Sequence, residues 1–180
     1  MQFTFNEEQD QLRATAQKFF ADKSPTAEVR RLMETQQGYD PVVWTQLSSE
    51  LGFTATHIPE VYGGLGLSYT ELGILFEEMG RTLFCAPFLA TAVAATAIMN
   101  VATESEKSEL LPDIATGTRI ATLAVFETSG QWGSDSIKLS AKNARLNGTK
   151  RYVLDGHIAD LVIVVARINH ASGADTIGFF

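Results

Sequence analysis

The stretch Gly117-Thr118-Arg119-Ile120-Ala121-Thr122-Leu123-Ala124-Val125-Phe126 separates two parts of the sequence with different residue patterns. From Ile120 onward it is an apolar run of the kind found in β-strands. Before it, apolar residues recur at helical spacing, whereas short β-prone runs follow it. We therefore expect an α+β fold, with an all-helical domain at residues 1–117 and a β-domain at residues 118–180.

The first of these two parts predicts helices that begin at recognisable caps. Four residues are suited to capping: Asn6, Asp40, Ser68 and Thr103. After Asn6, Ser68 and Thr103, a Gln or Glu follows three positions later and completes a capping-box pattern. Asp40 instead precedes a proline at the first helical position. The expected helix ends lie at Ser24-Pro25, Gly52, Gly80 and Pro112.

Residues 82–103 contain no charged side chain, and their length would allow a membrane span. Pro87, Asn100 and several threonines interrupt this stretch, which is Ala-rich and only moderately apolar. We therefore expect no membrane span and interpret the stretch as a helix that other helices cover on most sides.

The second part predicts an incomplete, mostly antiparallel, β-barrel-like domain. Asn147-Gly148 is a hairpin-turn signal between residues 144–146 and the run 150–154. Residues 161–166 form a continuous apolar run that is typical of a buried strand. Another strand begins at residue 176, and the sequence stops soon afterwards without a terminating turn. We interpret the chain as a truncated piece of a longer protein.

The composition argues against several classes of protein. The 180 residues are 45% hydrophobic, which is enough for a real core, and the net charge of −7 disfavours nucleic acid as a partner. Cys85 is the only cysteine, so neither an intrachain disulfide nor a cysteine-based zinc site is expected. His57, His157 and His170 are far apart in the sequence, so no metal site is predicted. The charged amino terminus has no signal-peptide pattern, which favours a cytoplasmic location.

Residues 127–135 form a loop rich in Gly, Ser and Thr that directly follows the first apolar run. A loop of this kind can offer backbone N–H groups to an anionic or polar ligand. It can equally be an ordinary connection between strands. The residues by themselves leave both interpretations open.

The order of several motifs resembles the acyl-CoA dehydrogenase family. Three stretches are similar to the family's amino-terminal helical domain: Phe5-Asn6-Glu7-Glu8-Gln9, the run from Ile58 to Ser68, and Glu77-Glu78-Met79-Gly80-Arg81. Residues 107–117 resemble the family's K-x-x-x-L-P-x-x-A-x-G motif, and residues 127–135 resemble its T-E-P-x-x-G-S-D loop. Together these motifs extend the resemblance over essentially the whole chain.

The resemblance implies an FAD cofactor and an acyl-CoA substrate that is oxidised to the 2,3-enoyl-CoA. The residues expected to line the flavin are Val125, Phe126, Glu127, Gly133, Ser134, Tyr152, Val153 and Leu154. Ser134 is also expected to contact the pantetheine arm of the substrate. In the family, a Glu of a further helical domain removes the α-proton. That base would lie beyond Phe180, so no catalytic residue is assigned and this chain alone is expected to be inactive.

The resemblance also implies a homo- or hetero-oligomer and electron-transfer flavoprotein as a partner. Two positions depart from the family pattern, because Phe126 and Leu154 stand where hydroxyl side chains normally contact the flavin. The loop is two residues longer than usual, and Trp132 lies in the extension. These departures leave two alternatives open: a degenerate, non-catalytic partner subunit of a heteromeric dehydrogenase, or a related flavin monooxygenase.

Overall fold

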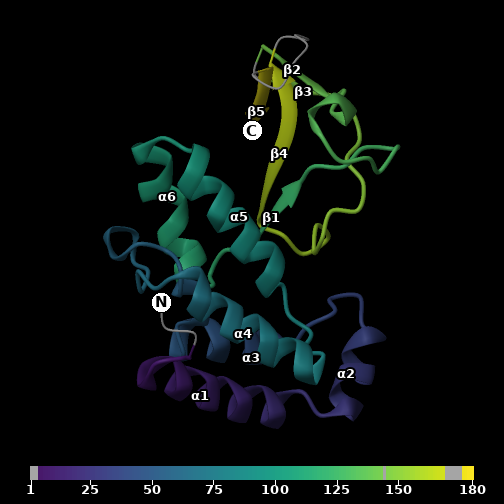
Figure 1. Ribbon diagram of the computed structural model, residues 1–180. Coiled ribbons are helices and arrows are strands. Elements are labelled where there is room, and N and C mark those ends of the chain that lie inside the picture. Colours follow the sequence, from purple (N-terminus) through teal and green to yellow (C-terminus); the bar gives the residue numbers. More distant parts are fainter. Residues whose placement is uncertain (1–3, 144, 169–175) are drawn as a thin grey trace.

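A computed structural model describes residues 4–143, 145–168 and 176–180 (Figure 1). Helices form the amino-terminal half, and a small sheet that does not close into a barrel forms the rest. The helices are α1 (Glu7–Lys23), α2 (Thr26–Met33), α3 (Pro41–Thr45), α4 (Tyr69–Thr82), α5 (Phe88–Val101) and α6 (Glu104–Ala115). The strands are β1 (Ala121–Ala124), β2 (Ser140–Lys142), β3 (Arg145–Leu146), β4 (Leu161–Ile168) and β5 (Ile177–Phe179). The expected α+β class is confirmed.

The predicted helix starts are confirmed in detail. Asn6, Ser68 and Thr103 each form a complete capping box with the residue three positions later. Asp40 accepts hydrogen bonds from the amides of Val42 and Val43 at the start of α3. These contacts satisfy backbone N–H groups that have no partner inside the helix. Local sequence is therefore sufficient to fix where these helices begin.

Two of the predicted helix ends are wrong. Gly80 lies inside α4, which continues to Thr82 and ends where Leu83 adopts a left-handed φ of 53°. Pro112 lies inside α6, whose last turn is held by the hydrogen bond from the Thr116 amide to the Pro112 carbonyl. Pro25 does follow the end of α1, but it also caps α2, a helix that the sequence pattern did not reveal. Helix α2 is stabilised by burial of Val29 and Leu32, a tertiary effect.

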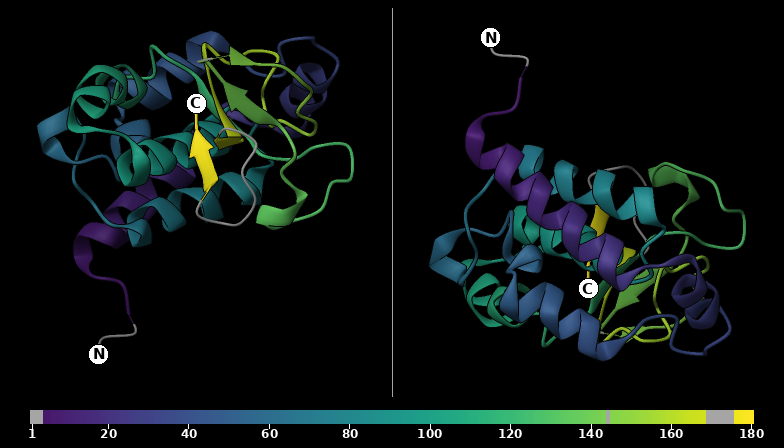
Figure 2. Two further views of the ribbon diagram at one scale, coloured as in Figure 1. Left: turned by 90° about the horizontal axis from the view of Figure 1, so that it is seen from above. Right: turned by 90° about the horizontal axis from the view of Figure 1, so that it is seen from below.

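Two apolar clusters hold the molecule together. The first lies between α1, α3 and α4, where the fully buried side chains of Phe20, Leu47 and Leu75 meet. The second lies between α5, α6 and the sheet, and includes Leu111 and Ile163. Figure 1 shows α1 beside α4 at one end of the molecule and the sheet at the other end, and Figure 2 views the molecule along this direction from both ends. The two clusters link the helices to the sheet through α5, which packs directly on β1.

Most of the charge-free stretch, residues 82–103, forms α5. The sequence predicted that other helices would cover this helix, but the sheet covers part of it as well. Ala94 and Ala95 are fully buried against α6 and the sheet, whereas Leu89, Val93 and Val101 remain exposed. Among the described residues, no helix combines the length and the apolar character that crossing a membrane requires.

The described sheet is mixed, rather than mostly antiparallel as predicted. Strand β4 pairs in parallel with β1 and β2 and antiparallel with β5, and β2 pairs antiparallel with β3. Arg167 in β4 is opposite Ser140 of β2 and also opposite Ile177 of β5, so these two strands lie on opposite edges of β4. Val164 is likewise opposite Ala124 of β1, while its backbone bonds to Phe180 on the other side. Strands β1 and β2 therefore follow one another along the same edge of β4.

The hairpin predicted at Asn147-Gly148 is also wrong. Strands β2 and β3 already pair antiparallel before this point, and Asn143 between them has a left-handed φ of 49°. Residues 150–154 form no strand; they lie beside β1 and the residues that follow it. Thr122 donates a hydrogen bond to the Leu154 carbonyl, and the Arg151 amide donates one to the Phe126 carbonyl. These non-local contacts override the local turn signal. Residue 144 of the predicted strand 144–146 lies outside the described residues.

The segment from Phe53 to Leu67 folds back on itself before α4. The amides of Leu65, Gly66 and Leu67 donate to the carbonyls of Ala55, Ile58 and Thr56, respectively. This close return places Gly64 so near the preceding turn that an added methyl group would overlap the Ile58 carbonyl oxygen. Space, rather than backbone conformation, therefore requires glycine here.

We expect Gly64→Ala to lower the free energy of unfolding by about 1–3 kcal/mol, because the backbone around Ile58 must shift. Gly73→Ala is the matched control, since Gly73 lies on the exposed face of α4 and nothing crowds an added methyl group. The control is expected to raise stability by about 0.5–1 kcal/mol. Urea denaturation of both variants measures the effects, and equal behaviour of the two would contradict this explanation.

Candidate functional site

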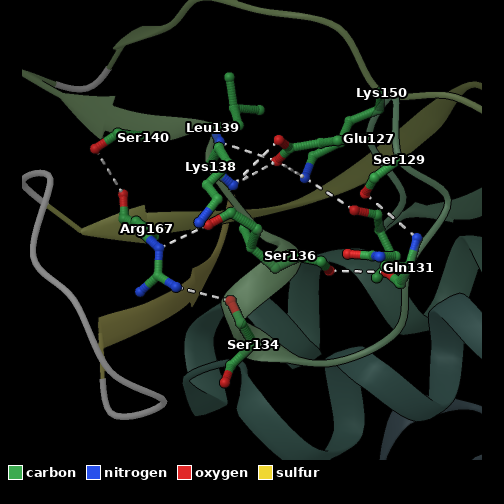
Figure 3. A network of polar contacts seen from close by, with 12 residues as sticks. Glu127, Ser129, Gln131, Ser134, Ser136, Lys138, Leu139, Ser140, Lys150 and Arg167 are labelled. Carbon is green, nitrogen blue, oxygen red and sulfur yellow. Dashed lines mark hydrogen bonds and ion pairs between the residues drawn. The ribbon is translucent and has the colours of Figure 1, made fainter.

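The candidate site is built on the segment that connects β1 to β2. Both strands lie along one edge of β4, so residues 125–139 leave the sheet and return to the same edge. The described part of this segment contains a single short helical turn, Ser134–Ser136. Figure 3 shows the polar contacts that hold this segment in place. A segment without regular structure keeps a fixed shape only when such contacts replace ladder hydrogen bonds.

Glu127 provides the first of these fastenings. Its carboxylate accepts hydrogen bonds from the backbone amides of Lys138 and Leu139 at distances of 2.9–3.1 Å. The same carboxylate forms an ion pair with Lys150, with Nζ 3.0 Å from Oε1. Lys150 also donates to the Val125 carbonyl. Glu127 therefore ties the two ends of the segment together and joins them to the chain that follows β3.

The Glu127–Lys150 pair is largely shielded from solvent, with 15% and 7% of the two side chains exposed. Burial tends to raise the pKa of the Glu127 carboxyl, but hydrogen bonds from the Leu139 and Lys138 amides and from Lys150 outweigh it and lower the pKa overall. The carboxylate is thus held in its charged form. A carboxylate engaged in this way is suited to holding structure and is a weak base.

Arg167 provides the second fastening, from the centre of the sheet. Its guanidinium is buried and donates from Nε to the Ile137 carbonyl at 2.6 Å and from Nη2 to the Ser134 carbonyl at 2.7 Å. Ser136 closes the turn by donating to the Gln131 and Gly133 carbonyls. The backbone around Gly133 and Ser134 is therefore fixed to β4.

The outer side of the segment exposes aromatic side chains. The rings of Phe126 and Trp132 meet edge to face with centroids 4.5 Å apart, although 83% of Trp132 is exposed. Tyr152 is 76% exposed, has a left-handed φ of 56° and lies against Gly130. Leu154 is half exposed. Exposed aromatic rings on a fastened backbone form a surface suited to a flat ligand.

Several backbone amides of residues 126–128 and 152–155 have no hydrogen-bond partner within the described part of the chain. Among them are the amides of Phe126 and Leu154, the two positions that lack the hydroxyl of the family pattern. Their segments run side by side, because Thr122 contacts the Leu154 carbonyl and Arg151 contacts the Phe126 carbonyl. Partly exposed N–H groups without a protein partner are available to a polar ligand.

The sequence-predicted site residues thus divide into groups. Phe126 and Tyr152 to Leu154 lie on neighbouring segments, with Val125 and Glu127 at the inner side of the first. Gly133 and Ser134 lie further along the loop, at the turn that Arg167 holds. Lys150 and Arg167 were missed by sequence reasoning. The signal for both was a basic residue within or beside a β-prone run, where burial demands a partner.

The two histidines that the structure describes, His57 and His157, do not assemble into a metal site. His57 is buried, with Nε2 3.2 Å from both the Ala92 carbonyl and the Thr96 hydroxyl, and burial lowers its pKa. His157 is exposed, and His170 lies outside the described residues. Across residues 4–143, 145–168 and 176–180, no group of three or more His, Cys, Asp or Glu side chains could hold a metal ion.

Comparison with known proteins identifies the class to which this fold and site belong. Residues 6–118 match the family model of the acyl-CoA dehydrogenase N-terminal domain. Acyl-CoA dehydrogenase IpdE2 of Mycolicibacterium smegmatis is 33% identical over 158 residues, which cover 88% of this chain and 42% of that protein. The chain therefore belongs to the acyl-CoA dehydrogenase family, and the resemblance seen in its motifs is confirmed.

Solved structures agree with this assignment. A variant of the Tcur3481-Tcur3483 steroid ACAD aligns with a TM-score of 0.82 and 30% identity, over 97% of this chain and 47% of that chain. An acyl-CoA dehydrogenase of Bacillus anthracis complexed with FAD aligns with a TM-score of 0.80 and 25% identity, over 98% and 30% of the two chains. The chain thus spans less than half the length of these relatives.

We expect Lys150→Met to destabilise the fold by about 3 kcal/mol at neutral pH, because it leaves the Glu127 carboxylate shielded from water without its cation. Burial would then raise the pKa of Glu127. The carboxyl would protonate as the pH falls, and the loss of stability relative to wild type should shrink between pH 7 and pH 4.

Lys138→Met is the matched control for this variant. Lys138 is exposed, and it contributes only its backbone amide to Glu127. Denaturant unfolding at both pH values measures the effect. A similar loss of stability in the two variants, or a loss in Lys150→Met that does not change with pH, would show that the ion pair does not hold the segment in place.

Proposed function

We propose that this chain is the front part of an FAD-dependent acyl-CoA dehydrogenase subunit, which oxidises an acyl-CoA thioester to the 2,3-enoyl-CoA. Family membership supports the reaction class, and a related structure is complexed with FAD. The observation that carries the proposal is the pair of unpartnered amides at Phe126 and Leu154 beside exposed Tyr152.

The residues present fit a flavin ring, although the family's hydroxyl side chains are absent. A flavin ring has polar atoms along its edge and apolar faces. The Phe126 and Leu154 amides supply donors for the edge, and the Tyr152 ring supplies a surface for a face. When bound, the flavin supplies the acceptor for the β-hydride of the substrate.

Glu127 does not serve as the base that removes the α-proton in this proposal. Its carboxylate is tied to Lys150 and to two backbone amides, and its pKa is lowered. A general base needs a pKa closer to the working pH and a free approach to the substrate. We therefore assign the base to a part of the subunit beyond Phe180, and propose that these residues alone do not turn over acyl-CoA. Electron-transfer flavoprotein is the proposed electron acceptor.

A second candidate function follows from the apolar side chains at Phe126 and Leu154. Replacing two hydroxyl donors by apolar groups weakens flavin binding wherever the backbone does not compensate. In that case the chain is a degenerate partner subunit, whose surface completes a site that another subunit mainly forms. Relatives solved as paired assemblies, such as Tcur3481-Tcur3483, make this arrangement a reasonable alternative.

For the first candidate, we expect the double variant Phe126→Thr, Leu154→Ser to bind FAD about tenfold more tightly than the wild-type chain, because it restores two hydroxyl groups beside the ring. Titration of flavin fluorescence measures the two dissociation constants. Val42→Thr is the control, since it adds a hydroxyl at an exposed position of α3. Unchanged FAD affinity in the double variant would argue against a flavin at this surface.

For the second candidate, we expect a complete subunit to retain FAD only when it is expressed together with its partner subunit. The measurement is the flavin absorbance of the purified protein and the reduction of an electron acceptor by acyl-CoA. Flavin content and activity without any partner would eliminate the degenerate-subunit interpretation. A complete subunit that stays colourless with each candidate partner would count against both interpretations.

A further inference from the structure

A cavity of about 340 Å³ lies between the helices and the loop that follows Leu154. We call it the Asp155 cleft. Phe84 and Pro87 line it from the connection between α4 and α5, Leu89 from the first turn of α5, and Tyr39 from the segment before α3. Leu154 lines it from the sheet side. Its volume lies at the lower end of the range for small-molecule sites, about 300–1,000 Å³.

Asp155 contributes a carboxyl group to this mainly apolar cleft. Its side chain has no hydrogen-bond or ion-pair partner among the residues that the structure describes. Burial raises its pKa, and nearby His157 only partly opposes this. Its backbone is held at a left-handed φ of 54°, a conformation that non-glycine residues adopt rarely. A partly buried carboxyl group without a donor from the protein is available to accept a hydrogen bond from a ligand.

The position of the cleft relates it to the proposed flavin surface. Leu154 lines the cleft, and its amide is among the N–H groups that have no partner in the described part of the chain. A ligand in the cleft therefore lies next to that surface. The other lining residues with a polar side-chain atom are Gln37, Tyr39 and Cys85, and Asp155 is the only carboxyl group among the lining residues. A neutral hydroxyl can donate to this carboxylate without the desolvation cost that an ammonium group would bring into a mainly apolar cleft.

We propose that the Asp155 cleft binds an aliphatic acyl group that carries a hydroxyl, with the Asp155 carboxylate accepting the hydrogen bond of that hydroxyl. This inference rests on the proposed function, because it names the substrate class of the same site. Apolar walls bind the aliphatic part, and the Asp155 carboxylate, which only accepts hydrogen bonds, selects chains with a hydroxyl over those without one.

The cleft contains its own reporter, because Cys85 is the only cysteine of the sequence and lines the same cavity. The experiment follows the rate at which monobromobimane alkylates Cys85 in the 180-residue chain at pH 8. The probes are 1-octanol and 1-methoxyheptane, isomers that differ in having or lacking the hydroxyl donor. We expect 1-octanol to protect Cys85 at about tenfold lower concentration than the ether. Glutathione alkylation, measured in parallel, corrects for effects on the reagent.

Two variants test whether Asp155 causes the preference. Asp155→Gly suits the left-handed backbone and removes the carboxylate, so both isomers should protect equally. Asp155→Asn keeps an acceptor but adds a donor for the ether oxygen, so the preference should shrink. Asp22→Ala, on the exposed face of α1, is the control and should keep the wild-type preference.

Equal protection by the two isomers in the wild-type chain, or an unchanged preference in Asp155→Gly, would overturn the inference. The flavin titration described above is independent of this test. A chain that binds FAD without an isomer preference refutes the cleft and leaves the proposed function intact. A preference that depends on Asp155 in a chain that fails to bind FAD supports the cleft and counts against the proposed function.

Discussion

One edge of β4 carries both β1 and β2, and the chain between them must leave the sheet and come back to it. Residues 125–139 therefore form a segment that cannot pair in the ladder, yet has its two ends fixed in register. The buried pair of Glu127 and Lys150 joins those ends, and Arg167 holds the middle. The remaining features of the candidate site follow from this arrangement. Trp132 and Tyr152 lie outside these polar contacts and are largely exposed.

The same constraint explains how charges and apolar groups are distributed around the site. Glu127 and Lys150 satisfy one another and the backbone, so they leave little charge for a ligand. The groups without a hydrogen-bond partner in the described part of the chain include the backbone amides of Phe126 and Leu154 and the carboxyl of Asp155. This distribution supports the proposal that the segment orients ligands rather than exchanging protons with them.

How far the sequence predicted this structure depends on the range of the interactions. The capping boxes at Asn6, Ser68 and Thr103 were predictable because each involves residues three positions apart. The path of the chain after Asn147-Gly148, where a hairpin was wrongly predicted, was not predictable, since Lys150 reaches back 23 residues to Glu127 and the following chain lies beside β1. The mixed sheet also depends on the sharing of one β4 edge, which no local pattern encodes. For the site, the motifs indicated the right segments, while their fastening by Lys150 and Arg167 and the cleft at Asp155 required the three-dimensional arrangement.

The shared strand edge also bears on how this segment tolerates change over evolution. Insertions between two fixed ends project outward without moving either strand, and the entropy of closing a loop grows only slowly with its length. Extra residues at the tip, where Trp132 lies exposed, therefore cost the sheet little. Natural variants of this fold can accordingly acquire new surface chemistry at the tip by lengthening the segment between β1 and β2, while the register of these strands with β4 is preserved.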